Sequence, residues 1–299
     1  MVTTRIQSAM MANLIQGARH MSSRQTIKHH FQQAIPVFDS GIGSFAVVQE
    51  IQRQMPTLPL IYLADRNSFP YGHLSLPALR DNIQKRIKWF EANFNPPAIV
   101  VASNAPSMTI LDQLHANRPI VGVRPPIQKA VAMSKTQHIA VLGTKNLVQS
   151  AALQQIKSEL TDTHLHLVDA SVLIERMERF QFVLDTAGTD RLMQSFFKDL
   201  FLRDPLIDTV TLSSTHLSFL DPIIRRHLPN LVCLDPANEV AQELSRVVSV
   251  LSSKIVPEQP LLLVLTTESS AFSAQSFSKG LALLGFKGSV EVVDINDAF

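Results

Sequence analysis

Short apolar runs alternate with amphipathic stretches along most of the chain. Apolar runs of strand length occur at 35–38, 60–63, 99–102, 120–123, 138–142, 165–168, 209–212, 231–234, 261–266 and 291–293. Most of the stretches between them have helical spacing, and the clearest, 79–94, carries an apolar face made by Leu79, Ile83, Ile87, Phe90 and Phe94. Strands that alternate with helices predict an α/β protein in which crossover helices join parallel strands.

Two of the predicted strands run into similar small polar loops. Residues 99–107 read Ile-Val-Val-Ala-Ser-Asn-Ala-Pro-Ser, and residues 210–219 read Val-Thr-Leu-Ser-Ser-Thr-His-Leu-Ser-Phe. In open α/β sheets, ligands bind beyond the carboxyl ends of the strands. The repeated design therefore predicts two related lobes whose half-sites face one ligand.

Two further loops follow the first two predicted strands. Residues 39–44 read Asp-Ser-Gly-Ile-Gly-Ser, where the glycines allow a tight turn and backbone amides can hold an anionic group. Gly-x-Gly alone is a weak signal. Residues 64–72 read Ala-Asp-Arg-Asn-Ser-Phe-Pro-Tyr-Gly, and the Pro and Gly that flank Tyr71 predict a fixed loop beside the first one.

Composition and charge limit the kinds of protein that this chain can be. A chain of 299 residues with 45% hydrophobic and 17% charged residues is typical of a globular protein with one large or two medium domains. A net charge of +2 gives no reason to expect nucleic acid or a membrane as partner, and no apolar run reaches the ~18 residues of a membrane span. The single cysteine, Cys233, excludes an intrachain disulfide and favours a cytoplasmic location.

The first 34 residues differ from the rest because they contain basic residues, such as Arg19, Arg24 and Lys28, and no acidic residue. Such a segment could be a targeting peptide or a nucleic-acid arm. We predict instead that residues 1–34 form a disordered basic tail that folding does not need.

Several polar residues have both a structural and a functional interpretation. Asp39 could simply cap the following helix, and His216 could be a satisfied core histidine. Two histidines, His164 and His166, share one face of a predicted strand at a spacing that a metal could use. Because no third ligand is nearby in the sequence, we predict no metal site.

The loops together resemble the glutamate racemase family, cofactor-independent enzymes that interconvert L- and D-glutamate for peptidoglycan synthesis. Residues 37–43 resemble the family's opening strand and loop, and 64–65 with 69–72 resemble its second loop. Ser103-Asn104 stands where the family has Cys-Asn-Thr, and Ser214-Thr215-His216 stands where it has Gly-Cys-Thr-His-Tyr-Pro. The resemblance covers about residues 35–294.

The resemblance implies two similar parallel-sheet α/β lobes with the ligand cleft between them. The first lobe would comprise residues 35–127 and 237–299, and the second lobe residues 128–236. The ligand would be glutamate or a related small acidic amino acid, no cofactor is expected, and the protein could be a homodimer, as family members often are.

The resemblance also assigns roles to residues of this sequence. Catalysis would fall to Ser103 and Ser214 at the two thiol positions, assisted by Asp39, Glu178 and His216; Glu175, one turn before Glu178, could face inwards in its place. Asp39 and His216 would also contact the substrate, together with Ser40, Pro70, Tyr71, Gly72, Asn104, Ala105 and Thr215.

The loss of both thiols decides the expected activity. A cysteine thiol has a pKa near 8.5, whereas that of a serine hydroxyl is roughly five units or more higher, so forming the alkoxide costs about 7 kcal/mol more. That difference corresponds to about five orders of magnitude in rate. We therefore expect racemase activity to be severely impaired or absent.

Two functions remain open from the sequence. The protein could be an enzyme, either a glutamate racemase or a slow relative that uses the serines or another base pair such as Asp39 and His216. Alternatively, it could be a non-catalytic protein that binds an acidic amino acid or contacts a protein partner.

Overall fold

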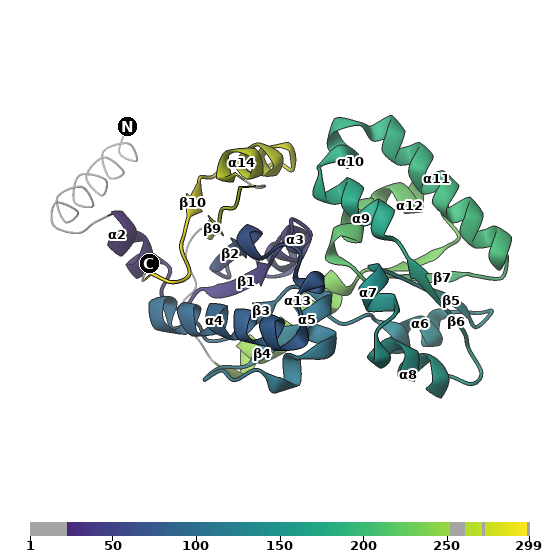
Figure 1. Cartoon of the computed structure of the whole chain (residues 1–299), viewed down its shortest axis with the longest axis horizontal. Helices are drawn as coiled ribbons and strands as arrows, with labels where there is room; N and C mark the ends of the chain where they lie inside the picture. Colours follow the sequence, from purple (N-terminus) through teal and green to yellow (C-terminus); the bar gives the residue numbers. More distant parts are fainter. Residues whose placement is uncertain (1–22, 252–260, 271–272, 298–299) are drawn as a thin grey trace, which may run out of the picture.

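Two parallel β-sheets lie side by side along the long axis of the molecule, each with helices on both faces (Figure 1). They are seen in a computed structural model that describes residues 23–251, 261–270 and 273–297. In this described part of the chain, no helix is long and apolar enough to cross a membrane. The predicted α/β class with two parallel-sheet lobes is confirmed.

The first sheet has six strands in the order β10-β9-β2-β1-β3-β4, all paired in parallel. Their bounds are β1 Ile35–Asp39, β2 Leu60–Ala64, β3 Ile99–Val101, β4 Ile120–Gly122, β9 Leu262–Thr266 and β10 Val290–Val292. Both faces of the central strand β1 are buried, because Val37 belongs to one hydrophobic cluster and Phe38 to another. A strand buried on both faces explains the continuous apolar runs in the sequence.

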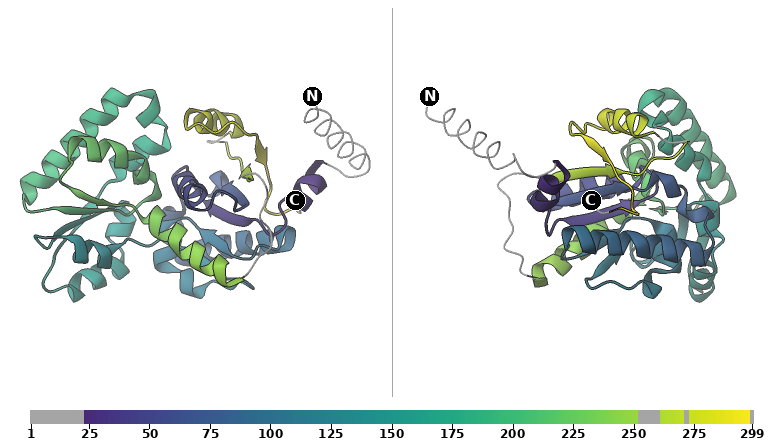
Figure 2. Two further views of the ribbon diagram at one scale, coloured as in Figure 1. Left: turned by 180° about the vertical axis from the view of Figure 1, so that it is seen from behind. Right: turned by 60° about the vertical axis from the view of Figure 1, so that its left-hand side comes forward.

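Helices of the first lobe supply those two clusters. Three of them pack on one face of the sheet, namely α3 (Ser44–Gln54), α13 (Pro236–Leu251) and α14 (Ala274–Leu283). The long helix α4 (Leu76–Phe94) packs on the other face, with its predicted apolar stripe inwards. Seen from behind, α13 is the light-green helix that lies against the first lobe (Figure 2).

The second sheet has four parallel strands in the order β6-β5-β7-β8. The strands are β5 His138–Gly143, β6 His164–Asp169, β7 Thr209–Leu212 and β8 Val232–Leu234. One face is covered by α9 (Ser171–Glu178), α11 (Thr186–Arg203) and α12 (Asp221–His227). The opposite face is covered by α6 (Ile127–Met133), α7 (Lys145–Val148) and α8 (Ala151–Glu159).

The division of the strands between the two sheets fits the two lobes expected from the resemblance, because β9 and β10, from the end of the chain, belong to the first sheet. The exact lobe boundaries stay a prediction. Within the lobes, the helix expected at 107–116 begins earlier, as α5 (Asn104–Thr109), directly after β3. Pro106 is tolerated there because amides in the first turn of a helix have no intrahelical partner.

Two other predicted helices are interrupted. The stretch 148–160 divides into α7 and α8, and Ser150 caps the new start by accepting a hydrogen bond from the Leu153 amide. The stretch 171–182 divides at Phe180, whose left-handed φ of 56° ends α9 before the short α10 (Gln181–Leu184). Hydrophobic periodicity runs through both breaks, so the sequence pattern does not reveal them.

The prediction of a disordered N-terminal tail is wrong for residues 23–34, which are folded. Residues 1–22 of the predicted tail lie outside the described residues. Helix α2 (Ser23–His30) is held to α4, since Lys28 Nζ donates to Asn93 Oδ1 at 2.9 Å. Partly buried Ile27 and Phe31 pack against the hydrophobic cluster that α4 covers. This segment is therefore part of the first lobe.

We expect Phe31→Ala to lower the free energy of unfolding by about 1–2 kcal/mol, because a half-buried aromatic ring contributes about half of what a buried one does. The exposed His29 on the same segment supplies the control, and His29→Ala should leave the urea midpoint nearly unchanged. Equal midpoints for both variants and the wild type would mean that this segment does not contribute to the core.

Candidate functional site

A cavity of about 560 Å³ lies between the lobes at the carboxyl ends of both sheets. All the site residues expected from the sequence line it: Asp39, Ser40, Pro70, Tyr71, Gly72, Asn104, Ala105, Ser103, Glu178, Ser214, Thr215 and His216. The structure therefore brings together residues that are up to 177 positions apart, from Asp39 to His216.

The two serines occupy equivalent places in the two lobes. Ser103 follows β3 and precedes α5, and Ser214 follows β7 and precedes η5 (Thr215–Leu220). Both residues are extended, with φ of −136° and −146°, and both stand at the N-terminal boundary of the following helix. The predicted twin half-sites are thus similar in backbone conformation as well as in sequence.

On the side of the first lobe, Ser103 contacts the carboxylate of Asp39 at the end of β1. Asp39 is only 5% exposed. Burial raises its pKa from 3.8 to about 6, although the charge of His216 and hydrogen bonds from Ser103 and the Ser40 amide oppose the shift. A carboxyl group with this pKa can either accept or donate a proton near neutral pH.

On the side of the second lobe, Ser214 lies beside a histidine–carboxylate pair. His216 Nε2 is 2.7 Å from Glu178 Oε2, and His216 Nδ1 is 3.4 Å from Ser214 Oγ. Because the carboxylate can only accept, Nε2 carries a proton, and in the neutral imidazole Nδ1 is left to accept from the Ser214 hydroxyl. His216 is then placed to act as a base toward Ser214.

Glu178 keeps its charge because donors from both lobes surround it. Its carboxylate forms an ion pair with Arg66, accepts from the Ile42 amide at 3.1 Å and contacts His216. Burial opposes ionisation, but the hydrogen bonds and charges of His216 and Arg66 outweigh burial and hold the pKa of Glu178 below its ordinary value. This one side chain therefore connects the second lobe to the first.

The turn after β1 comes unusually close to the second half-site. A Cβ added at Gly43 would lie 2.5 Å from the His216 amide and from Thr215 Oγ1, and one at Gly41 would lie 2.8 Å from Glu178 Oε2 and from the His216 ring. Any side chain at these positions would displace the groups that form the half-site. The Gly-x-Gly pattern thus serves close approach between the lobes.

The loop after β2 is fixed by a buried carboxylate. Asp65 accepts from Tyr71 Oη at 2.8 Å and from Arg86 at 2.8 and 3.0 Å, and the Tyr71 amide donates to Ser40 Oγ at 3.2 Å. These bonds hold residues 70–72 against the turn after β1, as predicted from the flanking Pro and Gly.

The structure also decides between several alternatives. Asp39 does not cap α3, because Gly43 is the boundary residue and no side chain caps that helix. Glu175 also lines the cavity, but its carboxylate pairs with exposed Arg179 at 2.6 Å, whereas Glu178 makes the buried contacts. The only cysteine, Cys233, lies in β8 outside the cavity, and burial raises its pKa, so its thiol is unreactive.

Sequence comparison relates the chain to known proteins. The chain is 31% identical over 264 residues to the glutamate racemase of Brucella anthropi, which covers 84% of this chain and 93% of that protein. It is also 31% identical over 220 residues to the glutamate racemase of Brucella melitensis, covering 71% and 79% of the two chains. No protein-family model matches.

This chain belongs to the glutamate racemase family. Solved structures agree: a Bacillus anthracis glutamate racemase isoform, 28% identical, covers 89% of this chain and 98% of its own with a TM-score of 0.68. The Escherichia coli glutamate racemase, 21% identical, covers 88% and 98% with a TM-score of 0.72 and therefore supports the fold.

Two cationic residues of this glutamate racemase relative were missed at the sequence level. Arg66 lies in the loop after β2, yet its contact with Glu178 spans 112 positions of the chain. Lys145 follows β5 at its carboxyl end and lines the cavity with Asn146, whose side-chain amide donates to the Gly72 carbonyl across the lobes. The rule that ligands bind at carboxyl ends of parallel strands could have indicated Lys145.

We expect Asp39→Asn to change how stability depends on pH. The folded wild type holds the Asp39 proton more tightly than the unfolded chain, so its free energy of unfolding falls as pH rises from about 4 to 7. Asparagine has no such proton. Relative to the wild type, the variant should therefore gain up to about 3 kcal/mol over this range, measured by urea unfolding.

The exposed Asp162 provides the comparison, and Asp162→Asn measures the background effect of removing a surface carboxylate over the same pH range. If Asp39→Asn shows only this background, Asp39 does not titrate near pH 6 in the folded protein.

Proposed function

We propose that the cavity between the lobes binds glutamate or a related small acidic amino acid, and that proton exchange at the α-carbon is severely impaired. One observation carries the proposal: the whole expected set of site residues lines a single cavity, while both expected thiol positions hold serine. The polar residues that line the cavity thus support binding of the amino acid, and serine at both thiol positions supports slow proton exchange.

Binding is supported by polar groups that both lobes present to the cavity. Asn104 Oδ1 is buried in the cavity wall without a hydrogen-bond partner among the described residues, so a ligand ammonium could satisfy it. Lys145 offers a cation to a carboxylate. Related structures are described as Escherichia coli glutamate racemase with L-glutamate and Francisella tularensis glutamate racemase with D-glutamate, which fits this ligand class.

Slow chemistry follows from the two hydroxyls. Each serine has a titratable neighbour, Asp39 beside Ser103 and His216 beside Ser214, so a proton could be passed on either face of the ligand. Forming an alkoxide costs roughly 7 kcal/mol more than forming a thiolate, and these neighbours offset only part of that extra cost. Residual exchange would therefore be slow on both faces.

We also infer from the family a cytoplasmic protein that uses no cofactor and is able to form a homodimer. Residual turnover would supply D-glutamate for peptidoglycan synthesis. The second candidate is a non-catalytic protein that senses an acidic amino acid or contacts a protein partner. The retained cavity combined with the missing thiols favours it over a protein with an unrelated enzymatic activity.

Purified protein should incorporate solvent deuterium at the α-position of either glutamate enantiomer at least about 10⁴-fold more slowly than an ordinary glutamate racemase assayed alongside. The Ser103→Ala, Ser214→Ala double variant defines the background. Turnover within a hundredfold of the ordinary enzyme would contradict the proposal, because hydroxyls would then suffice for the reaction.

Binding without turnover should appear as thermal stabilisation. At ~100 times its dissociation constant, glutamate or aspartate should add about 2.7 kcal/mol to the free energy of unfolding. Asn104→Ala should weaken binding by about tenfold, since a lost hydrogen bond costs about 0.5–1.5 kcal/mol. Exposed Asn230, outside the cavity, gives the control Asn230→Ala.

The screen should include both enantiomers of glutamate and aspartate and small dicarboxylates without an amino group. Stabilisation by dicarboxylates alone would mean that the ammonium is not recognised. If no compound shifts the transition and Asp39→Ala behaves as the wild type, the cavity does not bind acidic ligands and only an interaction scaffold remains.

A further inference from the structure

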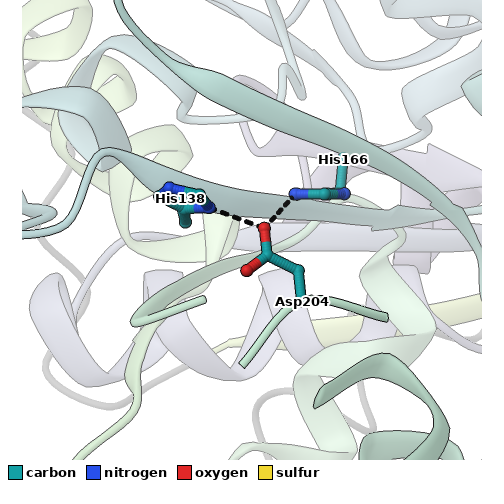
Figure 3. A group of neighbouring side chains, drawn as sticks. All are labelled: His138, His166 and Asp204. Carbon is teal, nitrogen blue, oxygen red and sulfur yellow. Dashed lines mark hydrogen bonds and ion pairs between the residues drawn. The ribbon is translucent and has the colours of Figure 1, made fainter. Parts of the chain in front are cut away.

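Among the described residues, three potential metal ligands meet in the second lobe, away from the cavity (Figure 3). His138 Nδ1 lies 2.6 Å and His166 Nε2 lies 2.7 Å from the same oxygen, Asp204 Oδ2. All three ligand atoms are within 4.8 Å of one another, and the three residues are partly buried. The cluster takes no part in the function proposed above.

The fold brings these residues together from three separate elements. His138 begins β5 and His166 is the third residue of the neighbouring parallel strand β6. His138 shares its face of the sheet with Ala140 and Leu142, which pack in the same cluster as α11. Asp204 follows the last residue of α11, so the C-terminal end of this helix places one carboxylate oxygen next to a ring nitrogen of each imidazole (Figure 3).

The carboxylate is oriented by the backbone. Asp204 Oδ1 accepts from the Leu206 amide at 3.0 Å, which turns Oδ2 toward the two histidines. A hydrogen bond that fixes the non-ligating atom of a ligand is the usual support around a protein metal site. His138 is held from its other side, because its ring stacks on that of His164 with centroids 4.2 Å apart.

We propose that His138, His166 and Asp204 form a binding site for one zinc ion. Two imidazoles and one carboxylate are a ligand set that zinc accepts, and a fourth position open to water completes a tetrahedron. The side chain of His166 is 35% exposed, so water and ions can reach this position. Hard cations such as magnesium would instead favour a site made wholly of oxygens.

The Asp204 carboxylate has to move only slightly to accept the ion. Zinc–ligand bonds of about 2.0–2.1 Å place tetrahedral ligand atoms roughly 3.3 Å apart. The Asp204 oxygen would therefore retreat from each imidazole nitrogen by roughly 0.6–0.7 Å. The ring nitrogens that face this oxygen would bind as neutral ligands, and the protons they carry in the metal-free protein would leave to solvent or to the outer ring nitrogens.

The site is at the opposite end of the second sheet from the cavity. β5 runs from His138, in the cluster, to Gly143, next to cavity residue Thr144, which corresponds to roughly 16 Å along an extended strand. Zinc bound here would join the end of α11 to β5 and β6 and would not contact the amino-acid ligand. Its effect is therefore on the stability of the second lobe.

The test is zinc binding by the full chain after removal of metals, measured by competition with a chromophoric chelator. We expect one zinc ion per chain in the micromolar range, with affinity reduced at least about tenfold in His166→Gln and in Asp204→Asn. His115→Gln, at an exposed histidine outside the cluster, should bind as the wild type does. Circular dichroism in chelator checks that each variant is folded.

Cobalt provides a second measurement that does not depend on the variants. The wild type with one equivalent of Co²⁺ should show the intense visible bands of a four-coordinate ion, and zinc should abolish them. Absence of these bands, absence of stoichiometric zinc, or unchanged zinc affinity in both folded variants would each overturn the proposal. Loss of the bound ion in His115→Gln would overturn it as well, because the ion would then lie elsewhere.

Discussion

The steric contact between the turn after β1 and the start of η5 determines how the two lobes meet. Gly43 lies so close to the His216 amide that even a methyl group would not fit, and Gly41 leaves only enough room for the Glu178 carboxylate. With the turn in this position, the Ile42 amide and the Arg66 guanidinium can both reach Glu178. The alignment of the half-sites thus depends first on the absence of two side chains.

The half-sites are similar in backbone but different in electrostatics. Ser103 faces a carboxyl group whose pKa burial raises, whereas Ser214 faces an imidazole whose partner carboxylate stays charged. One face is therefore suited to a group that exchanges its proton near neutral pH, and the other to a fixed tautomer. A proton that passes from one side of a ligand to the other needs an acceptor on one side and a donor on the other, and the two half-sites differ in this respect although both serines carry hydroxyls.

Much of the fold follows from local patterns, because strands buried on both faces give continuous apolar runs and their carboxyl ends converge on one edge. The cavity residues could be named from loop motifs for the same reason. Contacts between distant segments could not: Asp204 is 66 positions from His138 and 38 from His166, and nothing near it signals a ligand. Helix α2 was missed because its eight residues give too short a period to separate from a basic tail.

The contacts of Glu178 also have a kinetic consequence. Its carboxylate belongs to the second lobe and two of its three partners belong to the first, so separation of the lobes must expose an ion pair that is less than a tenth accessible. Opening must therefore break this ion pair and the hydrogen bond from the Ile42 amide together, and water must hydrate both charges before the lobes can part. A ligand that leaves only through the open form would therefore have a residence time limited by how often the contacts of Glu178 break, in addition to its own contacts with the cavity wall.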